Sequence, residues 1–174
     1  MTDTSAQMRA AIRAAATERT RLHALGARTP EAAPELAAAY AANREFLEKL
    51  NSPEALALLS AGDEDALEYA ACFLEVYPLC PDSGFAMRDL VRALRDTRIP
   101  ANLGKRLRVA FLTIVTHPAR DEMKHLRQLA LRVSDQPFVL ALDRLTESRD
   151  LVTAENSRSL ANYIAGRRRA SGNE

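Results

Sequence analysis

The chain of 174 residues has no tryptophan, two cysteines, six glycines and no long apolar run. Two cysteines, Cys72 and Cys80, do not build a disulfide framework, so buried structural thiols in a reduced, cytoplasmic setting are expected. The longest apolar run, residues 109–115, is far shorter than the ~20 residues that cross a bilayer, so no membrane association is predicted. Aromatic residues make up only 5% of the chain, which leaves few rings to stack on nucleic-acid bases.

Familiar catalytic signatures are missing as well. The sequence contains no G-x-S-x-G, no G-x-G-x-x-G, no P-loop and no H-E-x-x-H. The weak metal candidates are His117, Asp121 and His125, which are spaced by four residues and could share one helix face. However, His117 precedes Pro118 and fits a turn, while Asp121 and His125 fit a solvated i,i+4 pair. No catalytic residue, metal or cofactor is therefore predicted, and a metal-dependent enzyme is only the third interpretation.

The residues that are abundant point to helices. Alanine, leucine, arginine and glutamate lose little side-chain conformational freedom on entering a helix, so their abundance predicts an all-α protein. Pro100, Pro118 and Pro137 are 18 and 19 residues apart, which is the length of one helix plus a tight turn. Together with the apolar periodicity, this spacing predicts about nine helices. Their expected ranges are a first helix ending near 26, then 36–50, 53–60, 63–77, 83–94, 101–116, 119–133, 137–147 and 154–168.

The predicted helices suggest two parts and a tail. Residues 1–50 form an expected helical hairpin that could dimerise or dock onto another protein. Residues 51–170 form a core of antiparallel helical pairs, either a HEAT-like or armadillo-like stack or an irregular bundle. Residues 171–174 are expected to be a disordered tail. The lone glycines Gly62 and Gly166 are interpreted as helix ends.

Charge is sorted along the chain although the net charge is only +1. Residues 31–82 hold eleven acids and two bases, whereas residues 83–132 hold eleven bases and four acids. The two halves could neutralise each other within the fold, or one could face a partner. Helical-wheel positions predict that Glu75 pairs with Arg88 and that Glu68 pairs with Arg95 across one helical hairpin.

This pairing leaves an excess of bases around residues 98–127. If Asn102 is the N-cap of a helix, Gly104 presents an open backbone N–H beside Lys105 and Arg106. Free N–H groups and nearby cations would bind a phosphate or a carboxylate, although the same bases could instead pair with acids of the chain. The candidate residues for binding an anion or a partner are Arg98, Asn102, Gly104, Lys105, Arg106, Arg108, Arg120, Lys124 and Arg127.

The expected function is therefore a non-enzymatic, all-helical protein-interaction module, such as an adaptor, scaffold or regulator. A protein partner is expected, with a homodimer through residues 1–50 as one form of it. The alternative function is binding of nucleic acid or an anionic ligand by the basic region 98–127. The sequence does not separate these alternatives.

Overall fold

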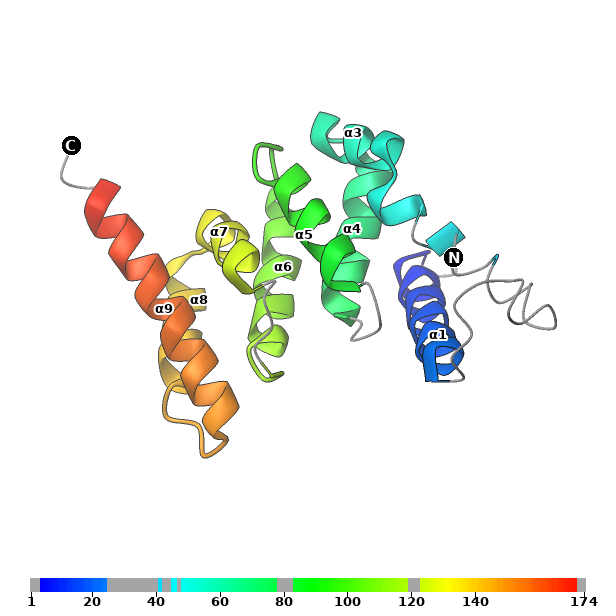
Figure 1. The fold of residues 1–174 in the computed structure, drawn as a ribbon. Coiled ribbons are helices and arrows are strands. Elements are labelled where there is room, and N and C mark those ends of the chain that lie inside the picture. The colour runs from blue at the N-terminus through cyan, green and yellow to red at the C-terminus, as the bar shows by residue number, and fades with distance from the viewer. Residues whose placement is uncertain are drawn as a thin grey trace. The chain divides into compact units, whose positions relative to one another are not determined.

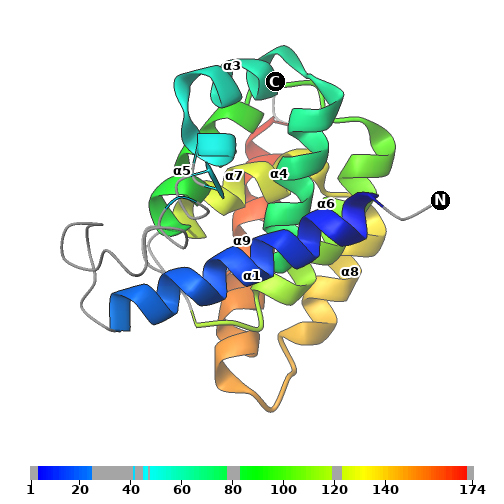
Figure 2. The same ribbon diagram turned by 90° about the vertical axis from the view of Figure 1, so that its right-hand side faces the viewer.

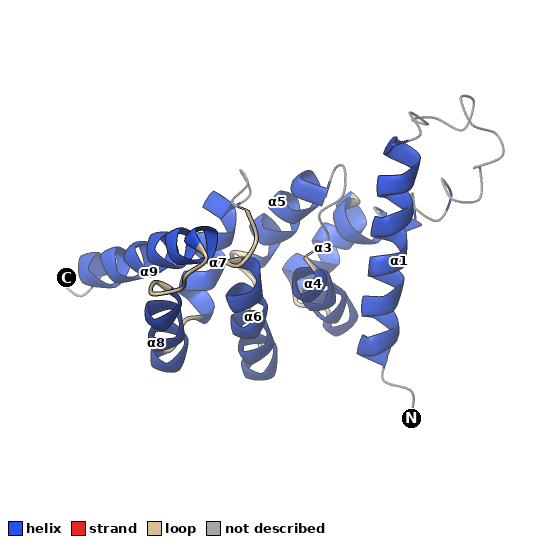
Figure 3. Cartoon of the chain, turned by 90° about the horizontal axis from the view of Figure 1, so that it is seen from below, coloured by secondary structure: helices blue, strands red, loops and turns tan. Residues whose placement is uncertain are grey.

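The computed structural model describes residues 4–24, 41, 45–46, 48–77, 83–118 and 123–171. Within these ranges the regular elements are helices and none is a strand, which confirms the all-α class (Figure 3). Residues 45–51 are helical where they are described. The helices with defined bounds are α1 (Thr4–Ala24), α3 (Pro53–Ala61), α4 (Glu64–Val76), α5 (Ser83–Leu94), α6 (Ala101–Ile114), α7 (Met123–Val133), α8 (Gln136–Leu145) and α9 (Leu151–Ser171). No described helix is both long enough and apolar enough to cross a membrane.

Contacts divide the chain into two compact units, residues 1–98 and residues 99–174. The division predicted after residue 50 stays a prediction, because much of its hairpin falls on residues outside the described ranges. The predicted tail, apart from residue 171, also lies outside them. The first unit holds eleven bases and fifteen acids, whereas the second holds thirteen bases and eight acids. The charge sorting of the sequence therefore becomes a balance of −4 in the first unit and +5 in the second.

The first unit is built around α4. Helix α1 lies across α4, and α3 contacts both α4 and α5 (Figures 1 and 2). Helix α4 buries Leu67, Ala70, Ala71, Cys72, Phe73 and Leu74. Phe73 is completely buried, and its ring centroid lies 6.0 Å from that of Phe46. Burial of such large apolar side chains is the main source of stability in a helical unit of this size.

The ends of α3 and α4 follow local sequence signals. Ser52 caps α3, since its Oγ accepts a hydrogen bond from the Ala55 amide at 3.1 Å, and Pro53 occupies the first turn. Asp63 caps α4 in the same way by accepting from the Ala66 amide at 3.0 Å. Gly62 ends α3 at φ 82°, a left-handed conformation that glycine adopts without steric penalty. The predicted starts of both helices are confirmed.

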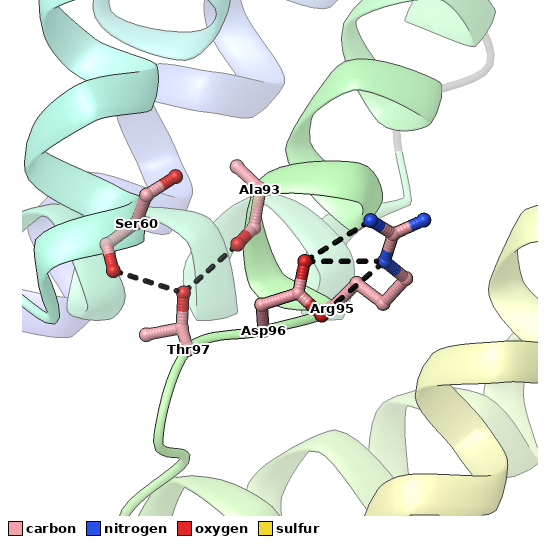
Figure 4. A network of polar contacts seen from close by, with 5 residues as sticks. All are labelled: Ser60, Ala93, Arg95, Asp96 and Thr97. Carbon is pink, nitrogen blue, oxygen red and sulfur yellow. Dashed lines mark hydrogen bonds and ion pairs between the residues drawn. The ribbon is translucent and has the colours of Figure 1, made fainter.

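Thr97 joins the ends of α3 and α5 (Figure 4). Its hydroxyl lies 2.8 Å from the carbonyl oxygen of Ala93 in α5 and 3.2 Å from that of Leu59 in α3. The side chain is only 3% exposed. The last carbonyls of a helix lack a partner from the next turn, so the buried hydroxyl of Thr97 adds a hydrogen-bond contact at the ends of both helices and ties them together.

The second unit consists of two consecutive helical pairs. Helix α6 contacts α7 and α8 contacts α9, while α6 also contacts α8 and α7 contacts α9. Two hydrogen bonds fix the relative direction of α7 and α9. Arg127 donates to the hydroxyl of Ser159, and Arg168 donates to the carbonyl oxygen of Ser134, directly after α7. Residue numbers rise together along both helices, so α7 and α9 run parallel, whereas α8 and α9 run in opposite directions (Figure 1).

Asn156 fastens α9 to the end of α6. Its Nδ2 donates to the carbonyl oxygens of Val115 and His117 at 3.1 and 2.7 Å, and the residue is 7% exposed. Asp150 caps the start of α9 through the amide and hydroxyl of Thr153, which hold the pKa of the Asp150 carboxyl below its usual value. Asp150 before the first turn of α9 and Asn156 within the helix thereby position α9.

Two helical details differ from the predictions. Gly166 does not end a helix, because α9 continues to Ser171. The guanidinium of Arg168 binds the oxygens of Ser134, which anchors the last turn of α9 after the glycine. In addition, α9 begins at Leu151, three residues before the predicted start at 154.

Candidate functional site

The start of α6 does not form the anion site predicted from the sequence. The helix begins at Ala101 with Pro100 as its N-cap, so Asn102 is already the second helical residue and is exposed. The Gly104 amide donates to the Pro100 carbonyl oxygen at 2.9 Å and is therefore part of the helix. The helix thus begins at 101, the first residue of the predicted range 101–116, and the alternative cap at Asn102, on which the open amide of Gly104 depended, is ruled out.

Arg108 performs an internal structural role. Its Nε lies 3.0 Å from Oδ2 of Asp135, and its Nη1 donates to the Val133 carbonyl oxygen at 2.9 Å. The other carboxylate oxygen of Asp135 accepts from the Phe138 amide and caps α8. Arg108 thus connects α6 to the end of α7 and the start of α8. Gly104 lies beside this guanidinium, since a methyl group at Gly104 would be 3.6 Å from Arg108 Nη1.

The other candidate bases are distributed over several elements. Lys105 is exposed on α6, and Lys124 is exposed on α7. Arg106 is half-buried on α6 and interacts with another group of the chain. Arg127 is half-buried and donates to Ser159 at 2.7 Å. Arg98 belongs to the first unit. Arg120 lies outside the described residues.

The metal candidates are likewise not brought together in what the structure describes. His117 lies in the turn after α6, as predicted, with its Nδ1 3.0 Å from the Thr113 carbonyl oxygen. His125 is half-buried in α7, and Asp121 lies outside the described residues. Among the described side chains, no three histidines, cysteines or carboxylates have an arrangement that could hold a metal ion.

The acids of α4 contact α1 in place of the predicted pairing with α5. Glu75 forms an ion pair with Arg9 at 3.0 Å, and Glu68 accepts a hydrogen bond from the Ser5 hydroxyl at 2.6 Å. The basic side chains of α5 are paired within α5 and the turn after it. Arg88 contacts Asp89 at 2.9 Å, and Arg95 contacts Asp96 at 3.1 Å. These carboxylates raise the pKa of both guanidinium groups, chiefly by hydrogen bonding.

The thiol of Cys72 is completely buried, as predicted, and lies 3.7 Å from the Ser5 carbonyl oxygen and 3.5 Å from a Glu68 carboxylate oxygen. It therefore belongs to the same contact between α1 and α4. Cys80 lies outside the described residues.

A groove lies on the first unit beside this contact. It has a volume of about 550 Å³, and α1, residues 45–49 and α4 line it. Three alanine methyl groups of α1 form its apolar floor, and the rings of Phe46 and Tyr69 add aromatic surface. Charged side chains complete the lining. The full set is Ala11, Ala14, Ala15, Glu18, Glu45, Phe46, Lys49 and Tyr69.

Each carboxylate of the groove has a neighbouring cation on its own helical segment. Glu18 is held by Arg21 at 2.8 and 2.5 Å, and Glu45 is held by Lys49 at 2.6 Å. These hydrogen bonds lower the pKa of both carboxyls, so both are ionised at neutral pH. The Tyr69 hydroxyl makes no hydrogen bond with the residues that the structure describes. The groove therefore offers apolar contact, two carboxylates that are each paired with a neighbouring cation, and one phenol.

Tyr69 makes the stability of the protein sensitive to high pH. Burial raises its pKa to about 12, and the negative charge of Glu45 adds to this shift. An unfolded tyrosine ionises near pH 10, so between about 10 and 12 the unfolded state loses its proton first. The contribution of the neutral phenol to the free energy of unfolding is therefore fully present below about pH 10, and it decreases as the pH rises toward 12.

We expect this linkage to lower the free energy of unfolding by about 2 kcal/mol by pH 12, after allowance for partial exposure. Denaturant unfolding at a series of alkaline pH values measures the loss. The Tyr69→Phe variant should lose less stability than the wild type over this interval. Equal losses in the two proteins would show that Tyr69 does not carry the effect.

No protein-family model matches the chain, and neither a curated protein nor a solved structure matches it. The candidate site is therefore interpreted from its own geometry.

Sequence reasoning missed the groove as a site. The pairing of Glu45 with Lys49 is an i,i+4 pattern visible in the sequence, and residues 1–50 were predicted to dock onto a partner. Tyr69 gave no such signal, because its place in the groove depends on how α1 packs against α4.

Proposed function

We propose that the protein is a non-enzymatic, all-helical interaction module, an adaptor, scaffold or regulator that binds a protein partner. The observation that carries the proposal is the groove on the first unit. Seven of its eight lining residues lie within residues 1–50, the segment that the sequence indicates as a docking element. A groove with an alanine floor and a charged rim suits a partner helix, whose apolar side chains would fill the space above the small methyl groups.

The charges at the groove indicate which kind of partner helix would fit it. The first unit has a balance of −4, and Glu18 and Glu45 lie at the groove. We therefore propose an amphipathic helical segment that carries aliphatic residues along one face and lysine or arginine beside them. Its cations would share the two carboxylates with Arg21 and Lys49, and with the net negative charge of the unit they would accelerate encounter more than they strengthen the final complex. The proposed location is the cytoplasm.

The second unit supports the finer architectural proposal of a HEAT-like or armadillo-like stack. In such stacks the first helices of successive pairs contact each other, and so do the second helices. Helices α6 and α8 have the first relation, and the parallel helices α7 and α9 have the second. Stacked pairs present extended surfaces to partners, which agrees with the proposed role.

Site-specific photo-crosslinking tests the proposed function. In the test variant a photoreactive amino acid replaces Ala14, which lines the groove. In the matched control it replaces Thr20, which is exposed on α1 and does not line the groove. In cells, we expect position 14 to capture a discrete protein that position 20 does not. The purified partner should then bind Ala14→Trp at least about tenfold more weakly than Thr20→Trp, because the indole fills the groove.

Two results would contradict the proposal. One is identical capture from both positions, and the other is equal binding by the two tryptophan variants. If the captured protein is a second copy of this chain, the groove is the dimer interface, and sedimentation of the two variants must show dissociation only for Ala14→Trp.

A further inference from the structure

In the second unit, helices α7 and α9 carry more basic residues than helices α6 and α8. Helix α7 contains Lys124, Arg127 and Arg132, and it has no acid within its bounds. Helix α9 contains four arginines, at 158, 167, 168 and 169, and Glu155 is its one acid. The seven bases thus face a single acid on these two helices. Helices α6 and α8 together hold four bases and one acid, and Asp135 caps α8.

Four of these arginines make hydrogen bonds that leave their charge uncompensated. Arg127 donates to a hydroxyl, and Arg158, Arg168 and Arg169 donate to backbone carbonyl oxygens. Among the described residues, no carboxylate pairs with these four or with Lys124. The first unit differs in this respect, since Arg9, Arg21, Arg88 and Arg95 each pair with a carboxylate there. Neutral oxygens orient a guanidinium without cancelling its field.

Because α7 and α9 run parallel, the bases of α7 lie beside those of α9, and the exposed Arg158 and Arg169 share one face of α9 since eleven residues make about three full turns. Arg127 lies at the level of Ser159, and Ser134 lies at the level of Arg168. From Arg158 to Arg169 the helix rises by about 16 Å. Duplex nucleic acid carries one charge per ~1.7 Å of axis, so such a row spans about ten phosphate charges. A small anion would need cations that converge on one point, whereas rows of this length suit a linear polyanion.

Neighbouring side chains favour double-stranded nucleic acid over an acidic protein or a single strand. The large exposed apolar residues of the second unit are Val109, Leu140, Leu151 and Val152. They lie on α6, α8 and the first turn of α9, so the basic rows lack the apolar anchors that dominate protein interfaces. Tyr163 is the one phenylalanine, tyrosine or tryptophan on α7 and α9, and the guanidinium of Arg167 lies over its ring. Single-strand binding uses open aromatic surfaces for base stacking.

We propose that the face formed by α7 and α9 binds the phosphate backbone of double-stranded nucleic acid. The binding is independent of base sequence, because phosphate contacts carry no sequence information. This surface differs from the region 98–127 predicted from the sequence. It excludes the start of α6 and adds Arg158 and the arginines at the end of α9. It is also separate from the groove on the first unit.

Fluorescence anisotropy with a labelled DNA duplex of about 20 base pairs, titrated with the full chain at low and rising salt, tests the proposal. The test variant carries Lys124→Gln, Arg158→Gln and Arg169→Gln. The control carries Lys105→Gln, Arg144→Gln and Arg149→Gln, which removes the same net charge from other exposed positions of the second unit. Circular dichroism and thermal unfolding establish that both variants fold.

We expect the wild type and the control to bind the duplex with similar affinity, and a duplex of scrambled sequence to bind equally well. The test variant should bind at least about tenfold more weakly at low salt, with the slope of log K against log salt reduced by up to about three. Three results would overturn the proposal. They are no duplex binding by the wild type at low salt, an equal loss in the control, and equal or tighter binding of polyglutamate or of a single strand.

Discussion

Replacing Phe73 by alanine is expected to lower the free energy of unfolding by about 3–5 kcal/mol. Phe73 lies in the last turn of α4 with no exposed surface, and its ring packs against that of Phe46. Alanine removes most of this buried apolar surface and leaves a cavity that the α1–α4 contact cannot fill without moving. Denaturant unfolding followed by circular dichroism measures the change.

Phe85 provides a matched control for this substitution. It is 61% exposed on α5, where Arg88 lies 5.3 Å from the centre of its ring. The same change, Phe85→Ala, should alter stability by less than about 1 kcal/mol, because it removes only surface contact and one exposed cation–π interaction. A Phe73→Ala effect no larger than that of Phe85→Ala would mean that α4 is not the centre of the first unit.

Asn156→Asp is expected to destabilise the protein by about 3 kcal/mol at neutral pH, although the two side chains have nearly the same shape. The amide of Asn156 donates to two carbonyl oxygens at the end of α6. An aspartate would place a buried negative charge beside them and leave both without a donor. The change therefore tests whether Asn156 holds α9 against α6 through these bonds.

The pH dependence of this variant gives a second measurement. Burial beside carbonyl oxygens raises the pKa of the introduced carboxyl above the unfolded value of about 3.9. The destabilisation should be smallest below that pH and should increase as the pH rises through the folded value. Asn162→Asp, on the exposed side of α9, is the control at each pH. If both variants respond alike to pH, Asn156 does not act through its two hydrogen bonds.

Features that depend on neighbouring residues in the sequence were predictable. Ser52, Pro53 and Asp63 identify the starts of α3 and α4, because a cap acts within three residues of its own position. Gly62 identifies the end of α3 for the same reason. Gly166 was misinterpreted, since a hydrogen bond from the side chain of Arg168 to Ser134, 34 residues away in sequence, anchors α9 after the glycine.

Features that depend on which helices meet were not predictable. A helical wheel places Glu68 and Glu75 on one side of α4, but it does not say whether α1 or α5 covers that side. The structure places α1 there, so Arg9 and Ser5 are the partners. The same uncertainty hid the groove, which requires α1 and residues 45–49 to meet Tyr69.

At the start of α6, two possible caps that lie two residues apart predict different chemistry. A cap at Asn102 would have left the amide of Gly104 open, whereas Pro100 as the cap places that amide in the first helical hydrogen bond. Pro100 and Asn102 both favour helix starts, so composition alone does not decide between them. A predicted anion site that relies on a helix terminus is only as accurate as the predicted terminus.

The two compact units carry opposite charge balances of −4 and +5, although the whole chain carries only +1. Each unit therefore has its own electrostatic preference: the first for cationic partners and the second for anionic ones. Attraction to a polycation and attraction to a polyanion are both available to the same chain, each through a different unit. Its isoelectric point describes neither behaviour, because one number averages two units of opposite sign.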